Sequence, residues 1–345
     1  KLLNGAINGM LTTLGDPFTV YLPPVSNTGF KQSMAGEFQG IGAELGMKDN
    51  KIVEISPLAD SPAIKAGIKP EDMILKVDGV STTGWTLSQT VEKIRGPKGT
   101  LVTLNVQHKD AKNAQDIKIA RGVITVKSID GNVKKIKDVT GVKKTDVLKE
   151  HGENEIMYLR LSQFGDKTNA DWSALINKLN LKVQNNKNFK GIVFDLRNNP
   201  GGYLTDAAFI ASEFIQQGQT VVIQQEGSGA QTKLTADRHG LFLTQPVVIL
   251  INKGSASASE IVSGALRDYN RAKLVGETSF GKGTVQQAED LGGGAGVHIT
   301  IAKWLTPKGN WINGKGLTPD IKVTPDAKDQ AHDLQLEKAI EELVK

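Results

Sequence analysis

The chain has 345 residues, more than a single domain usually contains, so we expect two or three units with enough length to bury a core. It contains no cysteine, which excludes disulfides, thiol nucleophiles and cysteine-based metal sites. The net charge of +5 is modest and the lysines are scattered among acidic residues, so nucleic-acid binding is not favoured, although a basic surface also suits an anionic membrane or cell wall.

The sequence predicts neither a metal site nor a membrane span. The histidines are too far apart to form a local metal motif, and we expect each to be a surface or strand residue; they are His108, His151, His239, His298 and His332. No run of about 18 apolar residues is present. Because the chain starts at Lys1 without a methionine, we expect a mature or truncated form, from which a signal or anchor would be missing.

Residues 1–35 are predicted to form an N-terminal helical arm. Apolar residues recur at helical spacing from Leu2 to Leu14, and a Gly-Asp-Pro sequence then ends the pattern. We expect Pro23-Pro24 to stop regular structure. The arm is interpreted as a packing or dimerisation segment.

The region 36–122 alternates short strands with two short helices. Ser61-Pro62 is typical of a helix start and Gly96-Pro97 of a helix end, and residues 73–77 predict a strand between the two helices. This order of elements closely resembles a PDZ domain of the protease-associated kind, most specifically over residues 61–79.

The resemblance implies a groove in which a peptide C-terminus adds as a strand beside residues 43–47, facing the helix at 87–95. Amides near residues 40–42 are expected to hold the terminal carboxylate, with a plain turn as the alternative for these glycines. The implied peptide-binding residues are Gly40, Ile41, Gly42, Ala43, Leu45, Leu87, Val91 and Arg95. Two roles stay open for Arg95, which can cap the carbonyls of its helix or pair with a group outside the domain.

Residues 123–155 are interpreted as a lysine-rich region connecting two domains. Apolar runs at 156–161 and 191–195, with a helical pattern between them, then predict the alternation of an α/β core. A glycine-rich loop at 196–202 precedes another helical pattern. We interpret Asp195 and Arg197 as a structural carboxylate and a helix or loop anchor rather than as catalytic charges.

A strand predicted at 246–252 leads through the small-residue run 254–260, Gly-Ser-Ala-Ser-Ala-Ser-Glu, into a helix. Such a turn can present a serine hydroxyl at the positive end of a helix, where unpaired backbone N–H groups can stabilise an oxyanion. From the residues alone, two other interpretations stay open. The small residues also permit close helix–strand packing, and Ser257 with Glu260 fits a capping box.

A base for this serine is offered by Lys282, which lies between two glycines. In the strand that follows, Lys282, Thr284 and Gln286 have the same parity, so we expect Lys282 and Gln286 to face the same way. A desolvated lysine loses its preference for the charged form and can act as a general base towards a hydroxyl. Gln286 can orient it.

Together, the runs 254–260 and 276–286 closely resemble the carboxy-terminal processing proteases, which are PDZ-containing Ser-Lys serine endopeptidases of the tail-specific type. The resemblance covers nearly the whole chain. It implies that Ser257 is the nucleophile, Lys282 the base and Gln286 the support of the lysine. It also implies an oxyanion hole in which the N–H of Ala258 is joined by that of Gly201 or Gly202. No metal or organic cofactor is then needed, because the chain supplies every group.

We therefore predict an α/β multidomain protein with a PDZ domain at 36–122, a protease core at 156–323 and a C-terminal helix at 324–345. Its function is predicted to be cleavage of proteins or peptides with accessible C-termini. By resemblance we expect an extracytoplasmic location, in the periplasm, the cell envelope or secreted. A homodimer through the terminal helices is possible, nucleic acid is not expected as a partner, and membrane association is expected only through a segment outside this chain.

Two other functions are alternatives to the protease. One is a catalytically silent PDZ scaffold that binds peptides, which the intact Ser257, Lys282 and Gln286 argue against. The other is an acyl-transfer or acyl-CoA enzyme on a related fold. A small thioester substrate needs no domain that recognises C-termini, so the PDZ-like region argues against this second rival.

Overall fold

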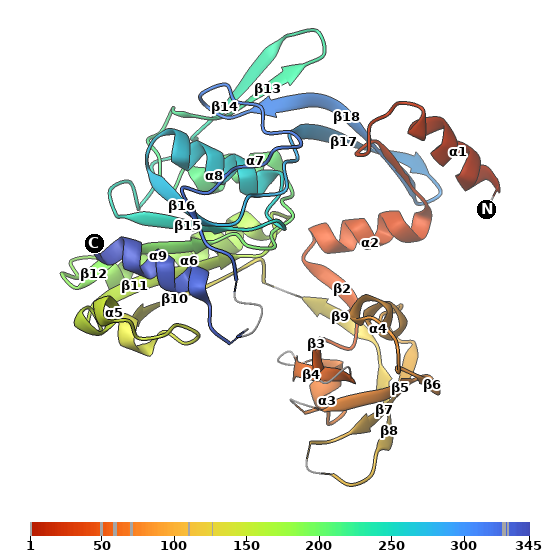
Figure 1. Cartoon of the computed structure of the whole chain (residues 1–345). Coiled ribbons are helices and arrows are strands. Elements are labelled where there is room, and N and C mark those ends of the chain that lie inside the picture. Colours follow the sequence, from red (N-terminus) through yellow and green to blue (C-terminus); the bar gives the residue numbers. More distant parts are fainter. Residues whose placement is uncertain are drawn as a thin grey trace. The chain divides into compact units, whose positions relative to one another are not determined.

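The computed structural model describes residues 2–48, 51–57, 61–69, 72–109, 111–125, 127–325, 329 and 331–345. They divide into two compact units (Figure 1). One unit combines Lys1–Gly36 with Lys127–Lys345, and the other is Glu37–Val126. The N-terminal arm therefore belongs to the larger unit, although the smaller one interrupts the chain between them.

The larger unit is built on a six-stranded sheet with the order β10-β11-β12-β15-β16-β19. Its strands are β10 (Ile129–Lys135), β11 (Glu155–Leu161), β12 (Phe189–Asp195), β15 (Val247–Ile251), β16 (Ala272–Gly276) and β19 (Ile321–Lys322). All are parallel to their neighbours except the edge strand β10, which is antiparallel to β11. The inner strands are runs of apolar residues because both faces of the sheet are covered.

Helices cover the two faces of this sheet. Ile192 and Phe194 of β12 belong to the core shared with α6 (Thr168–Val183), α7 (Leu204–Ala211) and α8 (Ala258–Asp268). Val193, between them, belongs to the core of the opposite face, which includes α5 (Asp146–Glu150) and α9 (Leu334–Val344). This is the α/β core that the alternating pattern predicted.

A second sheet of the larger unit is antiparallel. It has the order β1-β18-β13-β14, with β17 also paired to β18. Its strands are β1 (Val20–Leu22), β13 (Thr220–Glu226), β14 (Gln231–Thr235), β17 (Thr284–Gly292) and β18 (Ala295–Leu305). Because β1 pairs with β18, the N-terminal arm is joined to the strand hairpin that follows Lys282.

The arm contains α1 (Leu2–Thr12) and α2 (Pro24–Met34) on either side of β1. Regular structure stops before Pro23-Pro24 as expected, since β1 ends at Leu22, but it resumes at once, because α2 starts at Pro24. Proline suits the first turn of a helix, where its missing N–H would have no partner and its fixed φ is already helical. The same residue that breaks a helix interior therefore begins this one.

In its described residues, the smaller unit has two short helices and mainly antiparallel strands. Its larger sheet contains β3 (Ala43–Lys48), β4 (Lys51–Pro57), β5 (Met73–Val77), β6 (Val80–Ser81), β7 (Leu101–Gln107) and β8 (Gln115–Ala120). A separate pair joins β2 (Glu37–Gly40) to β9 (Gly122–Thr125). The helices are α3 (Pro62–Lys65), capped by the Ser61 hydroxyl, and α4 (Leu87–Ile94), capped by Thr86.

The region 123–155, expected to connect two domains, contributes to both units. Residues 122–125 form β9 of the smaller unit, whereas β10 is the edge strand of the core sheet and α5 lies on one face of that sheet. The helix predicted at the C-terminus is present as α9, but it begins at Leu334, where the Asp333 carboxylate accepts the N–H of Leu336 (2.9 Å).

Candidate active site

Three loops meet at the carboxyl ends of the parallel strands β12, β15 and β16, the edge where open α/β sheets place their ligands. They span residues 196–203, 252–257 and 277–283. Hydrogen bonds join them: the Ala256 N–H donates to the Asn199 carbonyl (3.0 Å), and the Phe280 N–H donates to the Ser255 carbonyl (2.9 Å). The sheet thus holds the serine turn between the other two loops.

The three serines of the turn differ in what their hydroxyls do. Ser255 Oγ donates to the Leu196 carbonyl (2.8 Å), and Ser259 Oγ donates to the Asn199 carbonyl (2.9 Å). Both residues are fully buried. Ser257 is partly exposed and lines a cavity of about 610 Å³, which neither of its neighbours lines. The turn therefore offers the Ser257 hydroxyl to a bound molecule and uses the other two to hold the loops together.

Ser257 has an unusual backbone conformation, with φ 54° and ψ −116°. A non-glycine residue at positive φ is strained and persists where its surroundings determine it. Here the Ser257 N–H donates to Glu260 Oε2 (2.8 Å), and its carbonyl accepts the N–H of Ile261 (2.9 Å). These bonds fix the turn at the start of α8.

Glu260 ties the serine turn to the lysine loop. Its Oε2 accepts the N–H of Ser257 and also that of Lys282 (2.9 Å), and its Oε1 accepts the Ser279 hydroxyl (2.5 Å) and the Gly281 N–H (2.7 Å). Burial raises the pKa of this carboxyl, whereas the four hydrogen bonds favour its charged form. Glu260, the acidic residue of the capping box considered from the sequence, therefore also binds the lysine loop. The contact that Ser279 makes with it was not predicted.

Lys282 and Gln286 line the same cavity as Ser257. Burial lowers the pKa of Lys282, an effect opposed by the charges of Asp16 and Glu260. Gln286 Nε2 donates to the hydroxyls of Thr284 (2.8 Å) and Thr300 (3.1 Å). The amide is therefore fixed by two strands of the hairpin.

The glycine loop after β12 lies directly against the serine. A Cβ added to Gly201 would lie 2.8 Å from Ser257 Cβ, and one added to Gly202 would lie 1.7 Å from the Phe164 carbonyl oxygen. The Gly201 N–H donates to Asn199 Oδ1 (2.9 Å), so this amide already has an acceptor. Within the described chain, no bond occupies the amides of Gly202 and Ala258.

One wall of the cavity comes from α2 of the N-terminal arm, through Asn27, Phe30, Lys31, Ser33 and Met34. No local sequence signal predicts this wall, because α2 reaches the site through the pairing of β1 with β18. His298 of β18 is a strand residue, as expected, and it also lines the cavity against the Phe30 ring, 4.5 Å between centroids. Burial and the charge of Lys282 lower the pKa of His298.

The predicted peptide-binding residues of the smaller unit lie on β3, on α4 and just before β3. Gly42, at φ 74°, requires a glycine, because an added Cβ would lie 2.5 Å from Ser61 Cβ. The buried Ile41 carbonyl accepts the Ala63 N–H (2.8 Å). Ala43 and Leu45 pack against the domain core and Val91 is half-buried, while the side chain of Leu87 lies outside the described part. Gly40 ends β2.

Arg95 ends α4 and its backbone N–H donates to the Val91 carbonyl (2.9 Å), but among the described residues its side chain makes no bond to the carbonyls of the helix, one of the two roles left open for it. Its guanidinium lies over the Phe38 ring, 5.0 Å from the centroid. The carbonyls at the end of α4 are instead bound by Arg121, whose Nε donates to Ile94 (2.7 Å) and whose Nη2 donates to Lys93 (3.2 Å). This role of Arg121 was not predicted from the sequence.

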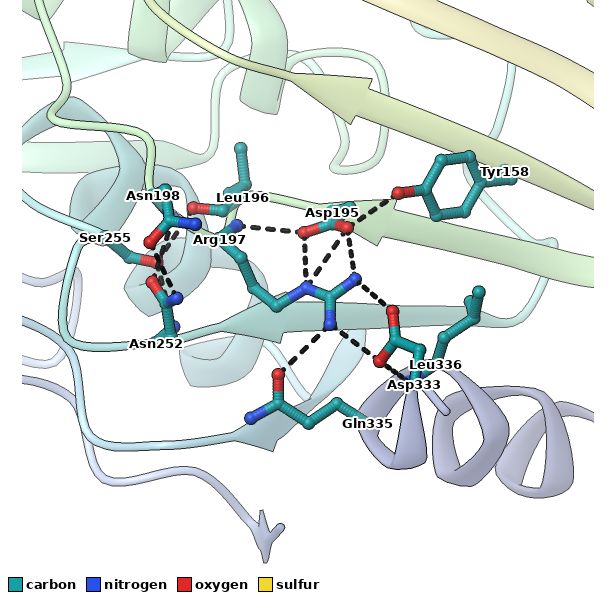
Figure 2. A network of polar contacts seen from close by, with 10 residues as sticks. All are labelled: Tyr158, Asp195, Leu196, Arg197, Asn198, Asn252, Ser255, Asp333, Gln335 and Leu336. Carbon is teal, nitrogen blue, oxygen red and sulfur yellow. Dashed lines mark hydrogen bonds and ion pairs between the residues drawn. The ribbon is translucent and has the colours of Figure 1, made fainter. Parts of the chain in front are cut away.

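Asp195 and Arg197 form the structural pair expected of them (Figure 2). Arg197 Nη2 contacts Asp195 Oδ2 at 2.6 Å and Asp333 Oδ2 at 2.8 Å, and Nη1 donates to Gln335 Oε1 (3.1 Å). Tyr158 also donates to Asp195 (2.7 Å). Neither member of the pair lines the cavity, and together they attach the start of α9 to the end of β12.

Among the residues that the structure describes, no group of three or more His, Asp or Glu side chains has the arrangement of a metal site. No helix in the described ranges is both long and apolar enough to cross a membrane.

Comparisons with known proteins identify the family. A model of peptidase family S41 matches residues 155–323, and a PDZ domain model matches residues 30–107. The carboxy-terminal-processing protease of Bartonella bacilliformis is 40% identical over 323 residues, which are 94% of this chain and 70% of that protein. The chain belongs to the carboxy-terminal processing proteases.

This family is one of serine peptidases. The carboxy-terminal processing protease CtpB of Bacillus subtilis is 38% identical over 346 residues, and the chain spans 66% of the length of CtpB. Among solved structures, the photosystem II D1 C-terminal processing protease gives a TM-score of 0.59 at 28% identity, covering 98% of this chain and 85% of that chain. The family and the α/β multidomain fold predicted from the sequence are confirmed.

Proposed function

We propose that this carboxy-terminal processing protease hydrolyses peptide bonds through an acyl-enzyme on Ser257. The observation that carries the proposal is that Ser257, Lys282 and Gln286 line one cavity, while the hydroxyls of the flanking serines are bound to backbone carbonyls. Glu260 supports it by fixing the backbones of Ser257 and Lys282 with a single carboxylate.

In the first step, neutral Lys282 takes the proton of the Ser257 hydroxyl, and Oγ attacks the carbonyl carbon of the substrate. The C=O electron pair moves to oxygen, and backbone N–H groups stabilise the oxyanion. Of the amides expected for this role, those of Gly202 and Ala258 have no other acceptor in the described chain, whereas the amide of Gly201 is bound by Asn199. We assign the hole to Gly202 and Ala258.

The tetrahedral intermediate collapses when Lys282, now an ammonium, gives its proton to the departing amine and the C–N bond breaks. Water then attacks the acyl-enzyme, with Lys282 again as the base, and releases the carboxylate product and Ser257. Gln286 keeps the lysine aimed at the serine. The half-buried position of Lys282 lowers its pKa, so that more of it is neutral near pH 7 than for a lysine in water.

We further propose that the PDZ unit selects proteins by their C-termini. A peptide would add as a strand along β3 and face α4, with its carboxylate at the amides of residues 40–42. Two features support this. Gly42 has the positive φ of a tight backbone approach, and Ala43, Leu45 and Val91 border the region between β3 and α4. By kinship with the processing proteases we propose an extracytoplasmic location.

The proposed activity is tested by incubating an unstructured protein with the native chain and with Ser257→Ala, and following cleavage by mass spectrometry. The substitution should reduce turnover by at least a thousandfold, because the nucleophile is lost. Ser255→Ala and Ser259→Ala are matched controls that should only weaken turnover, since they lose a loop contact and not the nucleophile. Cleavage by Ser257→Ala at the native rate would overturn the assignment, and absence of cleavage by the native chain would favour the silent scaffold.

A further inference from the structure

The N-terminal arm places a carboxylate next to the proposed base. Just before β1, residues 16–19 form a tight turn in which Asp16 Oδ1 accepts the N–H of Phe18 (3.1 Å) and Oδ2 accepts the hydroxyl of Thr19 (2.6 Å). The ring of Phe18 lies 5.2 Å from Lys282 Nζ, centroid to nitrogen. The pairing of β1 with β18 keeps this turn beside the lysine.

A chain of hydrogen bonds leads from the same turn to Gln286. Thr19 Oγ1, which donates to Asp16, accepts the N–H of Thr300 (3.1 Å) on β18. The Thr300 hydroxyl in turn accepts from Gln286 Nε2 (3.1 Å). The turn therefore contacts Lys282 through the Phe18 ring and adds the charge of Asp16. It is connected to Gln286 through the hydroxyls of Thr19 and Thr300.

Charged and titratable groups approach Lys282 from three elements: Asp16 from the arm, Glu260 from α8 and His298 from β18. Other charged groups on the cavity wall are Lys31, Glu289 and Asp290, of which Lys31 and Asp290 form an ion pair (2.9 Å). Glu260 binds backbone amides of the lysine loop. Burial works against the charged form of Asp16, but bonds from Thr19, Thr300 and the backbone hold its pKa below the usual value.

We propose that Asp16 is a positioning residue that the N-terminal arm contributes to the active site, where it holds the Lys282 ammonium and, through Thr19 and Thr300, the Gln286 amide. The inference rests on the proposed function. A half-buried lysine must be neutral to take the serine proton, and the ammonium that results is poorly solvated until it protonates the leaving amine. The carboxylate lies in the turn whose Phe18 ring contacts Lys282 Nζ, and its charge favours the ammonium between the two transfers.

The test uses Asp16→Asn, which retains an oxygen acceptor for the Phe18 N–H and removes the charge. Asp16⁻ favours the ammonium, so its loss should move the Lys282 titration to lower pH by roughly one unit. The readout is the ¹³Cε chemical shift of Lys282 in lysine-labelled protein, assigned by its loss in Lys282→Arg. The rising limb of kcat against pH should shift in the same direction, and plateau kcat should fall several-fold with little change in KM.

Asp320→Asn is the matched control, because it removes an exposed carboxylate that accepts the Leu274 N–H (2.7 Å) on β16 and does not line the cavity. It should leave the titration unchanged. Asp16→Glu keeps the charge and should keep the native midpoint, and it replaces Asp16→Asn if thermal unfolding shows that the latter does not fold.

An unchanged Lys282 midpoint in folded Asp16→Asn would overturn the inference, as would an equal shift in Asp320→Asn. A lower melting temperature without a shifted midpoint would identify the turn as structural, which also contradicts the proposal. The chemical-shift titration needs no substrate, so it decides this point even if Ser257→Ala retains cleavage and the proposed function fails.

Discussion

At the residue scale, Ser257 could be proposed as the nucleophile from the sequence, but the physical reason for preferring it among three serines is in the structure. Three serines alternate in one turn, and alternation alone makes them similar. The bonds from Ser255 to Leu196 and from Ser259 to Asn199 separate them, and both acceptors lie in a loop about 60 residues away in the chain. The sequence also did not show that the Asn199 side chain accepts the N–H of Gly201. An Asn side chain can accept a backbone N–H two residues onward, and this local bond competes with the use of that N–H in an oxyanion hole.

The proposed base gives a prediction about pH. Burial lowers the pKa of Lys282, so its neutral fraction grows as pH rises through the shifted value. Turnover should therefore increase across neutral pH and level off above that value. Lys282→Arg should lose about a hundredfold or more in kcat, because a guanidinium stays protonated whatever its surroundings.

Measurement of kcat from pH 5 to pH 10, with Lys273→Arg as the matched control, checks this. Lys273 is an exposed lysine that pairs with Glu342 (3.2 Å), and its substitution should leave the profile unchanged. Substantial activity in Lys282→Arg would exclude Lys282 as the base. The cavity residue to test next would then be His298, which faces the same space.

At the scale of elements, the strands and helices that flank the site followed their periodicity, as did α1 at the start of the arm, but the position of the arm could not be predicted. Local pattern identifies a buried strand at residues 247–251 and a helix after Ser257. It cannot show that β1 pairs with β18, some 275 residues later, or that α2 then forms a wall of the cavity. Pairing over such a separation depends on the whole fold rather than on the propensities of either segment.

The attachment of α9 gives a prediction about stability. Asp333 caps α9 and also pairs with the largely buried Arg197 (2.8 Å). In a variant without the Asp333 carboxylate, Arg197 would keep Asp195 as its partner. Asp333→Ala should therefore lower the free energy of unfolding by about 2–4 kcal/mol. Below its melting temperature the variant should retain near-native kcat, because the pair does not line the cavity.

Urea unfolding and turnover of Asp333→Ala and Asp329→Ala test this. Asp329 pairs with Lys143 at 3.4 Å on the surface, so its substitution should cost no more than about 1 kcal/mol. Equal losses in the two variants would mean that the Arg197 pair contributes no more than a surface contact.

At the scale of the whole molecule, two units were predictable from the change in pattern near residue 36, but the path of the chain through them was not. The region 123–155 supplies β9 to the smaller unit and β10 to the core sheet, although its lysine-rich composition is typical of a connecting segment. A lysine-rich composition indicates exposure to solvent, and an edge strand such as β10 is also exposed along one side. Composition therefore did not distinguish an edge strand from a connecting segment. The larger unit is thus discontinuous in sequence, with the smaller one inserted after the arm.

The two-unit organisation leads to a prediction about substrate choice. If the smaller unit selects C-termini, an unstructured protein with an apolar C-terminal residue should be cleaved with a lower KM than the same protein ending in a C-terminal amide. Val91→Asp, on the half-buried side of α4, should raise the KM for the first substrate about tenfold and leave cleavage of a short internal peptide unchanged. Lys93→Asp, an exposed position on the same helix, is the matched control and should have a small effect. Equal KM values for the carboxylate and amide forms with the native protein would show that the smaller unit does not recognise a free C-terminus, whatever the core unit cleaves.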